Sequence, residues 1–93
     1  MNQHIIDFLT EFLGTFIFLY VIFSTGNYLA IGAILAILVL LVHNYSIASF
    51  NPACSIAMYY NNKISKQTLL IVLVAEILGG LLTIPFLNKI KLK

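Results

Sequence analysis

The sequence predicts an all-α membrane protein with three transmembrane helices and one re-entrant half-helix. Apolar residues make up 61% of the 93-residue chain and charged residues 9%, and the apolar runs approach the roughly 20 residues that cross a bilayer. A short polar segment at residues 46–57, SIASFNPACSIA, interrupts these runs. At membrane depth, such a segment is tolerated only where it is buried in protein or lines a wet cavity. The segment therefore favours a pore.

The first two spans follow from the apolar runs and the turn residues between them. The first covers about Ile5 to Phe23 and ends at the turn residues 24–27. The second begins near Tyr28. Its apolar run, residues 29–42, is short for a span, so we expect its end to be wet.

The half-helix is predicted from the sequence Asn51-Pro52-Ala53. Asn is a good N-cap, Pro suits the first helical position, and the helix can continue to Tyr60 before the polar residues 61–63 stop it. A helix of about ten residues is about 15 Å long, which is half of a hydrocarbon core about 30 Å thick. It is expected to enter the membrane and stop midway.

The third span is predicted from Lys66 to Leu87, with Ser65 as its cap and Pro85 near its end. Residues 88–93 then form a basic tail. The whole chain, residues 1–93, is expected to form a single transmembrane domain and a multi-pass integral membrane protein.

Asn51 also suggests what a pore of this kind would conduct. If its side-chain oxygen caps the helix by accepting the N–H of Ala53 or Cys54, its amide group remains free to donate to a passing water. The positive end of the helix dipole would disfavour cations at the same point. A neutral solute is therefore expected. The alternative is that Asn51 and Pro52 only cap an ordinary helix after a loop.

Four stretches of sequence resemble the N-terminal half of the aquaporin and glycerol-facilitator family. Residues 11–16, EFLGTF, resemble the first-helix signature of that family. Residues 46–53 are similar to its S-G-A-H-L-N-P-A pattern, with Ile47 in place of Gly and Ser49 in place of His. Ile64-Ser65 precedes the third helix as in the family, and residues 75–80, AEILGG, resemble its A-Q-x-x-G-A segment with Glu in place of Gln. The match covers nearly the whole chain.

The resemblance implies a passive channel for water or small neutral solutes such as glycerol, but the chain is only half as long as the family's fold requires. The family fuses two such halves, inverted relative to each other, and its second N-P-A is followed by a pore-lining Arg. This chain has one half and no Arg. A second subunit must then complete the pore, either an inverted copy of this chain or a separate half-length chain. A tetramer of such pores is a further assembly that the resemblance implies.

The charge distribution permits the inverted copy. The N-terminal amine, Lys63 and Lys66 would lie on one side of the membrane, and Lys89, Lys91 and Lys93 on the other. A clear excess on one side would have fixed a single orientation, and no such excess is present.

The resemblance also assigns roles to individual residues. It implies that Asn51, Pro52 and Ala53 lie at the pore centre, and that the selectivity constriction is formed by Ile31, Val39, Ala48 and Cys54. The alternative for Cys54 is simple packing. Glu11 is expected to support the loop by accepting hydrogen bonds from its backbone, with a proton relay as the alternative. Glu76 is a second candidate for structural support, with its charge state left open.

The sequence gives little support for other classes of function. Arg is absent and there is one Cys, so neither a nucleic-acid footprint nor an internal disulfide is expected. We expect no enzymatic activity, no cofactor and no metal, and membrane lipids as surroundings. Two alternatives to a solute channel stay open. One is a non-conducting structural or regulatory subunit, and the other is a small viroporin-like ion pore built around Glu11 or Glu76.

Overall fold

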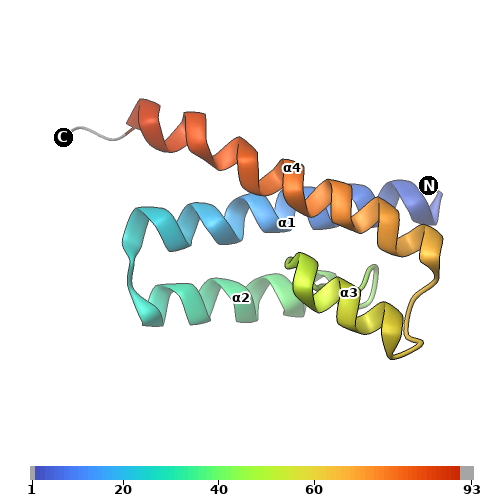
Figure 1. The fold of residues 1–93 in the computed structure, drawn as a ribbon. Coiled ribbons are helices and arrows are strands. Elements are labelled where there is room, and N and C mark those ends of the chain that lie inside the picture. Colours follow the sequence, from blue (N-terminus) through green and yellow to red (C-terminus); the bar gives the residue numbers. More distant parts are fainter. Residues whose placement is uncertain (1, 91–93) are drawn as a thin grey trace.

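The computed structural model describes residues 2–90, and these residues form four helices and no strand. The helices are α1 (Gln3–Thr25), α2 (Tyr28–Val42), α3 (Pro52–Tyr60) and α4 (Lys66–Ile90). Figure 1 shows α1 and α4 as two long helices side by side, with α2 along α1 and the short α3 beside only the first half of α4. Within the described residues, α1 contacts α2 and α4, α3 contacts α4, and α2 contacts neither α3 nor α4.

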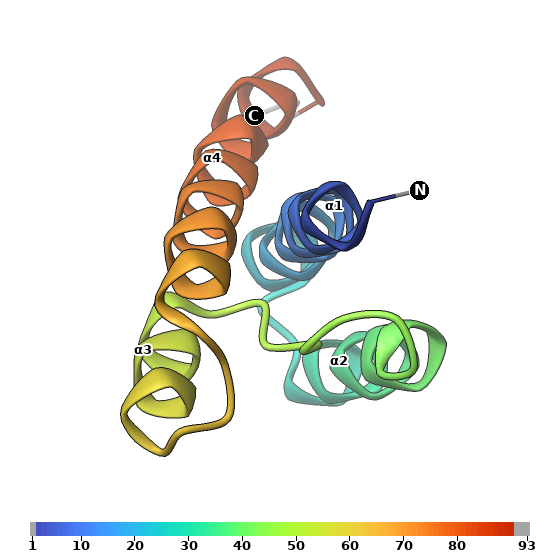
Figure 2. The ribbon, with the colours of Figure 1, turned by 90° about the vertical axis from the view of Figure 1, so that its right-hand side faces the viewer.

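The segment between α2 and α3 determines where α3 starts. Viewed end-on, it leaves the end of α2 and crosses beneath α1 before α3 begins next to α4 (Figure 2). The N-terminus of α3 therefore lies partway along the bundle, while its C-terminus lies at the end where α4 begins (Figure 1). The N-terminus of α1 and the C-terminus of α4 lie at opposite ends of the bundle.

Asparagine and serine side chains begin the helices, as local capping rules predict. Asn27 Oδ1 accepts hydrogen bonds from the N–H groups of Leu29 and Ala30 at 2.9 and 3.0 Å. Ser65 Oγ accepts from the N–H of Thr68 at 3.1 Å. Such caps satisfy backbone donors that the first helical turn leaves free. The first helix, α1, extends two residues beyond each expected end, since Asn2 caps it and Gly26 ends it in the left-handed region at φ 55°.

The end of α4 differs from the sequence prediction. The expected helix stops at Leu87 with a basic tail after it, but α4 continues through Pro85 to Ile90. Proline removes one hydrogen bond, to the carbonyl four residues earlier, and the residues that follow it include good helix formers. One lost bond does not stop the helix here. Lys91 and Lys93 of the expected tail lie outside the described residues.

Two of the helices are long and apolar enough to cross a membrane, by length and composition. These are α1 and residues Lys66–Asn88 of α4, with 23 residues each. Helix α2 is apolar but has 15 residues, so it is only about 22 Å long. Two of the three expected spans thus have the length and composition of a membrane-crossing helix, and their crossing of a membrane stays a prediction.

The long helices pack closely because glycine lies at their contact. A Cβ atom on Gly79 would collide with the backbone carbonyl oxygen of Phe12, and one on Gly80 would lie 2.8 Å from Leu19 Cδ1. Small residues allow such an approach of two helix backbones.

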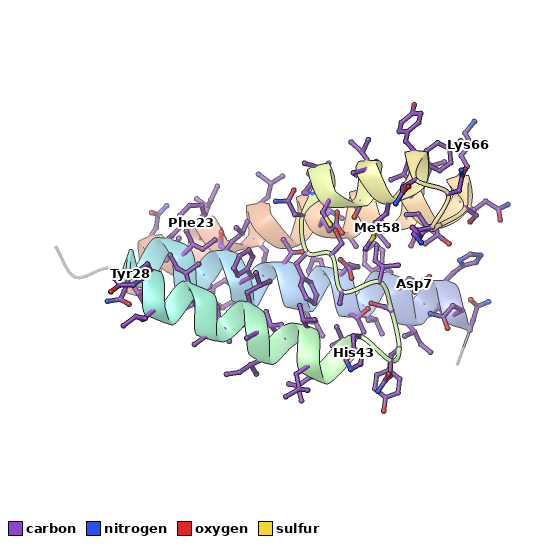
Figure 3. All side chains as sticks on the ribbon, turned by 90° about the horizontal axis from the view of Figure 1, so that it is seen from below. Asp7, Phe23, Tyr28, His43, Met58 and Lys66 are labelled. Atoms are coloured by element: carbon purple, nitrogen blue, oxygen red, sulfur yellow. The ribbon has the colours of Figure 1, made fainter. Side chains whose placement is uncertain are left out.

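The burial pattern is unusual for a chain of this composition. Among the residues whose burial the structure describes, five hydrophobic side chains are buried, against seven polar or charged ones. The seven polar residues are Asp7, Glu11 and Thr15 on α1, Ser49 in the connection between α2 and α3, Ser55 on α3, and Glu76 and Thr83 on α4. Large apolar residues instead cover the outside of α1, α2 and α4, as the side chains in Figure 3 illustrate for the labelled Phe23 and Tyr28.

Candidate functional site

The candidate site is built around residues 46–51, the irregular part of the connection between α2 and α3. Two of its residues, Ala48 and Phe50, have φ angles of 52° and 55°. This left-handed region is unfavourable for residues with a Cβ atom, and such conformations persist where the surroundings hold them. Three sets of contacts hold this segment.

Glu11 provides the first set of contacts, from the middle of α1. Its carboxylate accepts hydrogen bonds from the Phe50 N–H at 2.8 Å, the Ser49 N–H at 3.3 Å and the Ser46 hydroxyl at 3.2 Å. The side chain is fully buried, at 0% exposure. Backbone donors of an irregular segment need partners when water is excluded, and a carboxylate can accept several of them. Glu11 therefore lies where the family resemblance implied, and accepts bonds from the loop backbone.

The side chain of Phe50 provides the second contact. Its ring is 2% exposed and lies directly over Gly14, one turn after Glu11 on the same face of α1. A Cβ atom at position 14 would overlap the ring. Gly14 thus leaves the space that the ring occupies, and the ring holds the strained backbone of Phe50 beside Glu11.

A chain of side-chain contacts from α4 provides the third. Glu76 Oε2 lies 2.7 Å from Ser55 Oγ, which lies 2.8 Å from Ser49 Oγ. Ser49 Oγ donates to the backbone carbonyl of Asn51 at 2.9 Å. Glu76 and Ser55 are 1% and 0% exposed, so these contacts form away from the surface. They connect α4 to the start of α3.

Asn51 ends the segment and caps α3, as the sequence predicted. Its Oδ1 accepts a hydrogen bond from the Ala53 N–H at 2.8 Å, and Pro52 is the first residue of α3. The Asn51 side chain is exposed, and its amide nitrogen has no hydrogen-bond partner among the described residues. The prediction that Asn51 caps with its oxygen is therefore confirmed, and its two amide hydrogens remain available to a solute.

A cavity of about 370 Å³ lies at the N-terminus of α3, between α1 and α4. Its walls are mostly apolar, but two buried polar atoms in residues that line it have no hydrogen-bond partner within residues 2–90: Thr15 Oγ1 and Glu76 Oε1. The cavity is lined by α1, by α4, and by the last residues of the irregular segment with the first residue of α3. The lining residues are Thr15, Phe18, Leu19 and Ile22 on α1, Phe50 and Asn51 before α3, Pro52 on α3, and Glu76, Ile77, Gly80 and Leu81 on α4.

The residues expected to form the constriction are not gathered in one chain. Ile31 and Val39 lie on α2, Ala48 in the segment that follows it, and the exposed Cys54 on α3. Helices α2 and α3 are not in contact within the described residues, so Ile31 and Val39 lie on a different part of the bundle from Cys54 (Figure 2). A ring that a second subunit would complete remains a prediction.

Sequence reasoning missed Ser55 and the roles of Ser49 and Gly14. A sequence signal was present for Ser55 and for Gly14. Ser55 interrupts an apolar helix one turn after Asn51, and Gly14 lies on the same face of α1 as Glu11, three residues later. Among residues 2–90, no three His, Cys, Asp or Glu side chains are grouped as metal ligands.

Comparisons with family models, with curated proteins and with solved structures found no match to this chain. A function can therefore be assigned to this chain only from the geometry of the site.

Proposed function

We propose that this chain is one half of a passive membrane channel for water or small neutral solutes, and that a second copy in the opposite orientation completes the pore. The observation that carries the proposal is the free amide of Asn51, at the N-terminus of a half-length helix that faces a cavity between α1 and α4.

The burial pattern supports a location in the membrane. In water, leaving apolar area exposed costs about 25 cal/mol per Å², so a soluble chain buries apolar residues first. This chain buries more polar than apolar side chains and exposes large apolar ones along α1, α2 and α4. Lipid would cover that exterior at no such cost. The buried carboxylates and hydroxyls then face the bundle interior, where intramembrane polar groups normally lie.

The dimensions of α3 support a re-entrant half-helix. Its nine residues make it about 13 Å long, less than half of a hydrocarbon core about 30 Å thick. It begins partway along α4 and ends where α4 starts (Figure 1). Its N-terminus would therefore lie near mid-depth, and the loop before it would be irregular backbone that protein contacts satisfy.

The chemistry of that N-terminus favours neutral solutes. The amide group of Asn51 can donate to a solute oxygen, and the helix N-terminus carries the equivalent of about half a positive charge. Cations and protons are disfavoured at such a point, whereas a neutral molecule with an acceptor oxygen is not.

A second copy of the chain is supported by what one copy leaves incomplete. The cavity continues past the N-terminus of α3, along the half of α4 that α3 does not cover. An inverted copy would place its own α3 there, N-terminus to N-terminus. Because α1 begins and α4 ends at opposite ends of the bundle (Figure 1), this copy must cross the membrane in the reverse direction. By sequence, the N-terminal amine, Lys63 and Lys66 balance Lys89, Lys91 and Lys93, so charge favours neither direction strongly.

The experiment measures osmotic water permeability and cation leak of proteoliposomes that contain the purified chain. Asn51→Asp puts a carboxylate at the proposed pore centre, and a charge at a helix N-terminus interacts with the dipole by up to ~2 kcal/mol. That carboxylate also attracts a cation about 4 Å away by about 1 kcal/mol in water and about 4 kcal/mol at an effective dielectric constant of about 20, which the neutral amide does not. We expect water flux to fall or a cation leak to appear.

Asn27→Asp is the matched control. Asn27 caps α2 in the same way, through its side-chain oxygen, but at the end of the bundle and away from the cavity. Its substitution should leave both measurements unchanged. Equal behaviour of the two variants would contradict the pore assignment. No flux through wild type would indicate a separate partner chain or a non-conducting subunit, and an ion current would indicate an ion pore.

A further inference from the structure

Glu76 is the buried group that the proposed channel does not yet use. It projects from α4 toward α3, where its Oε2 lies 2.7 Å from Ser55 Oγ. Its other oxygen, Oε1, is buried without a partner. The family resemblance gave a neutral residue at this position and left the charge state of Glu76 open.

The number of available protons decides that charge state. Three short contacts connect Glu76 Oε2, Ser55 Oγ, Ser49 Oγ and the Asn51 carbonyl oxygen, at 2.7, 2.8 and 2.9 Å. Each contact needs one hydrogen between its two oxygens. The Asn51 carbonyl has none to give, and each serine hydroxyl has one. The two serines therefore supply two protons for three hydrogen bonds.

The direction of the chain follows from its carbonyl end. Since the Asn51 carbonyl only accepts, the Ser49 hydroxyl must donate to it. The Ser55 hydroxyl must then donate to Ser49 Oγ, and the remaining proton must come from Glu76. If Glu76 were ionised, two oxygens would face each other at hydrogen-bond distance with only lone pairs between them.

We propose that Glu76 acts as a neutral carboxylic acid that donates to Ser55 and so fixes the position of Asn51 at the pore centre. It is a positioning residue, because Ser55 and Ser49 lie between it and the loop. The proposal rests on the proposed function for the role of Asn51, but the proton on Glu76 is argued from the hydrogen bonds alone.

The neighbouring charge is consistent with this arrangement. Within residues 2–90, the ionisable group that faces Glu76 from the packed helices is Glu11 on α1, and α3 contributes the Ser55 hydroxyl. The carboxyl group of Glu11 accepts three hydrogen bonds from the loop. Two adjacent buried carboxylates would repel each other, whereas one carboxylate and one acid would not. The acid and the carboxylate thus hold the same loop, Glu76 through Ser49 Oγ and Glu11 through Ser49 N–H.

Infrared spectroscopy of the lipid-reconstituted protein tests the proton directly. The chain has two glutamates, Glu11 and Glu76, so ¹³C labelling of glutamate carboxyl groups shifts their bands away from that of the one aspartate, Asp7. Wild type should show a protonated carboxylic acid band that moves with the label and is lost in Glu76→Gln. It should persist in Asp7→Asn, which removes a buried carboxyl group outside the network. A wild-type spectrum without this band, or a band that remains in Glu76→Gln, overturns the proposal.

A second measurement tests the positioning role. Gln carries an NH₂ group that can donate to Ser55 without a charge, whereas Leu cannot donate at all. Glu76→Gln should therefore keep the wild-type melting temperature and flux, and Glu76→Leu and Ser55→Ala should lose flux. Equal loss in Glu76→Gln and Glu76→Leu would show that a charge, not a donor, is needed, and would overturn the proposal. A glutamate acid band without any flux would refute the channel and leave the proton assignment standing.

Discussion

Gly14→Ala provides a sharp test of how the loop is held, because the structure contains its own control. At position 14 a Cβ atom would overlap the ring of Phe50, while at Gly32 on α2 nothing lies within 4 Å. Both glycines are in helices, so Ala should add up to about 1 kcal/mol of helix stability at each. At Gly14 the overlap should cost about 1–3 kcal/mol, as overpacking does elsewhere.

The expected contrast between the two variants is therefore about 1–3 kcal/mol in the free energy of unfolding. Gly32→Ala should be neutral or more stable than wild type, and Gly14→Ala less stable. Denaturant titration of the protein in detergent micelles, followed by circular dichroism, measures the difference. Because displacing the ring also pulls the Phe50 N–H from Glu11, Gly14→Ala should lose flux as well. The double variant Gly14→Ala, Phe50→Leu should recover part of the stability. If Gly14→Ala proves as stable as Gly32→Ala, the ring does not hold the loop and the argument is wrong.

Three further outcomes are expected. A small mercurial should react with the exposed Cys54 and block flux through wild type, while Cys54→Ser should stay open. Cys54→Arg should reduce glycerol flux more than water flux. If the reagent left wild-type flux unchanged, Cys54 would not be part of the constriction. A Cys added at the C-terminus of Cys54→Ser should be labelled from both faces of vesicles, whereas labelling from one face would require a separate partner chain. Ser65→Ala should lower the free energy of unfolding by about 1 kcal/mol, measured by the same titration, since Ser65 caps α4, and an unchanged value would show that this cap is not needed.

The sequence predicted local features of the fold well. The caps at Asn51 and Ser65 and the start of α3 at Pro52 depend on side chains within three residues of the helix end, so they can be read from sequence. The end of α4 was predicted at Leu87, three residues before the observed end at Ile90, because the residues after Pro85 were taken for a tail and not for helix.

The tertiary part of the site was harder to predict. The left-handed φ angles of Ala48 and Phe50 have no local cause, since both residues carry a Cβ atom. They follow from Glu11 and Gly14, which precede them by more than thirty residues and belong to another helix. Ser55 looked like an ordinary small residue on a short helix. Its role appears only once α4 places Glu76 beside it.

The three sets of contacts act on the same few residues, so variants that remove any one of them should lose stability and flux together. Glu11 holds the N–H groups of Ser49 and Phe50, Gly14 admits the Phe50 ring, and Glu76 acts through Ser55 on Ser49 and Asn51. Each contact offsets part of the strain of two left-handed residues, which is of order 1–3 kcal/mol for each residue. A variant that removes one of these contacts should release the loop, and so should lower stability and flux together.

Variants at the pore surface should behave differently. The side chains of Asn51 and Cys54 are exposed in one chain, so changes there remove few internal contacts and should alter flux or selectivity while stability stays near wild type. Plotting flux against the free energy of unfolding for both groups would separate them. If the Asn51 and Cys54 variants lost stability in proportion to flux, Asn51 would be a structural cap alone, and the proposed pore would lose its main support.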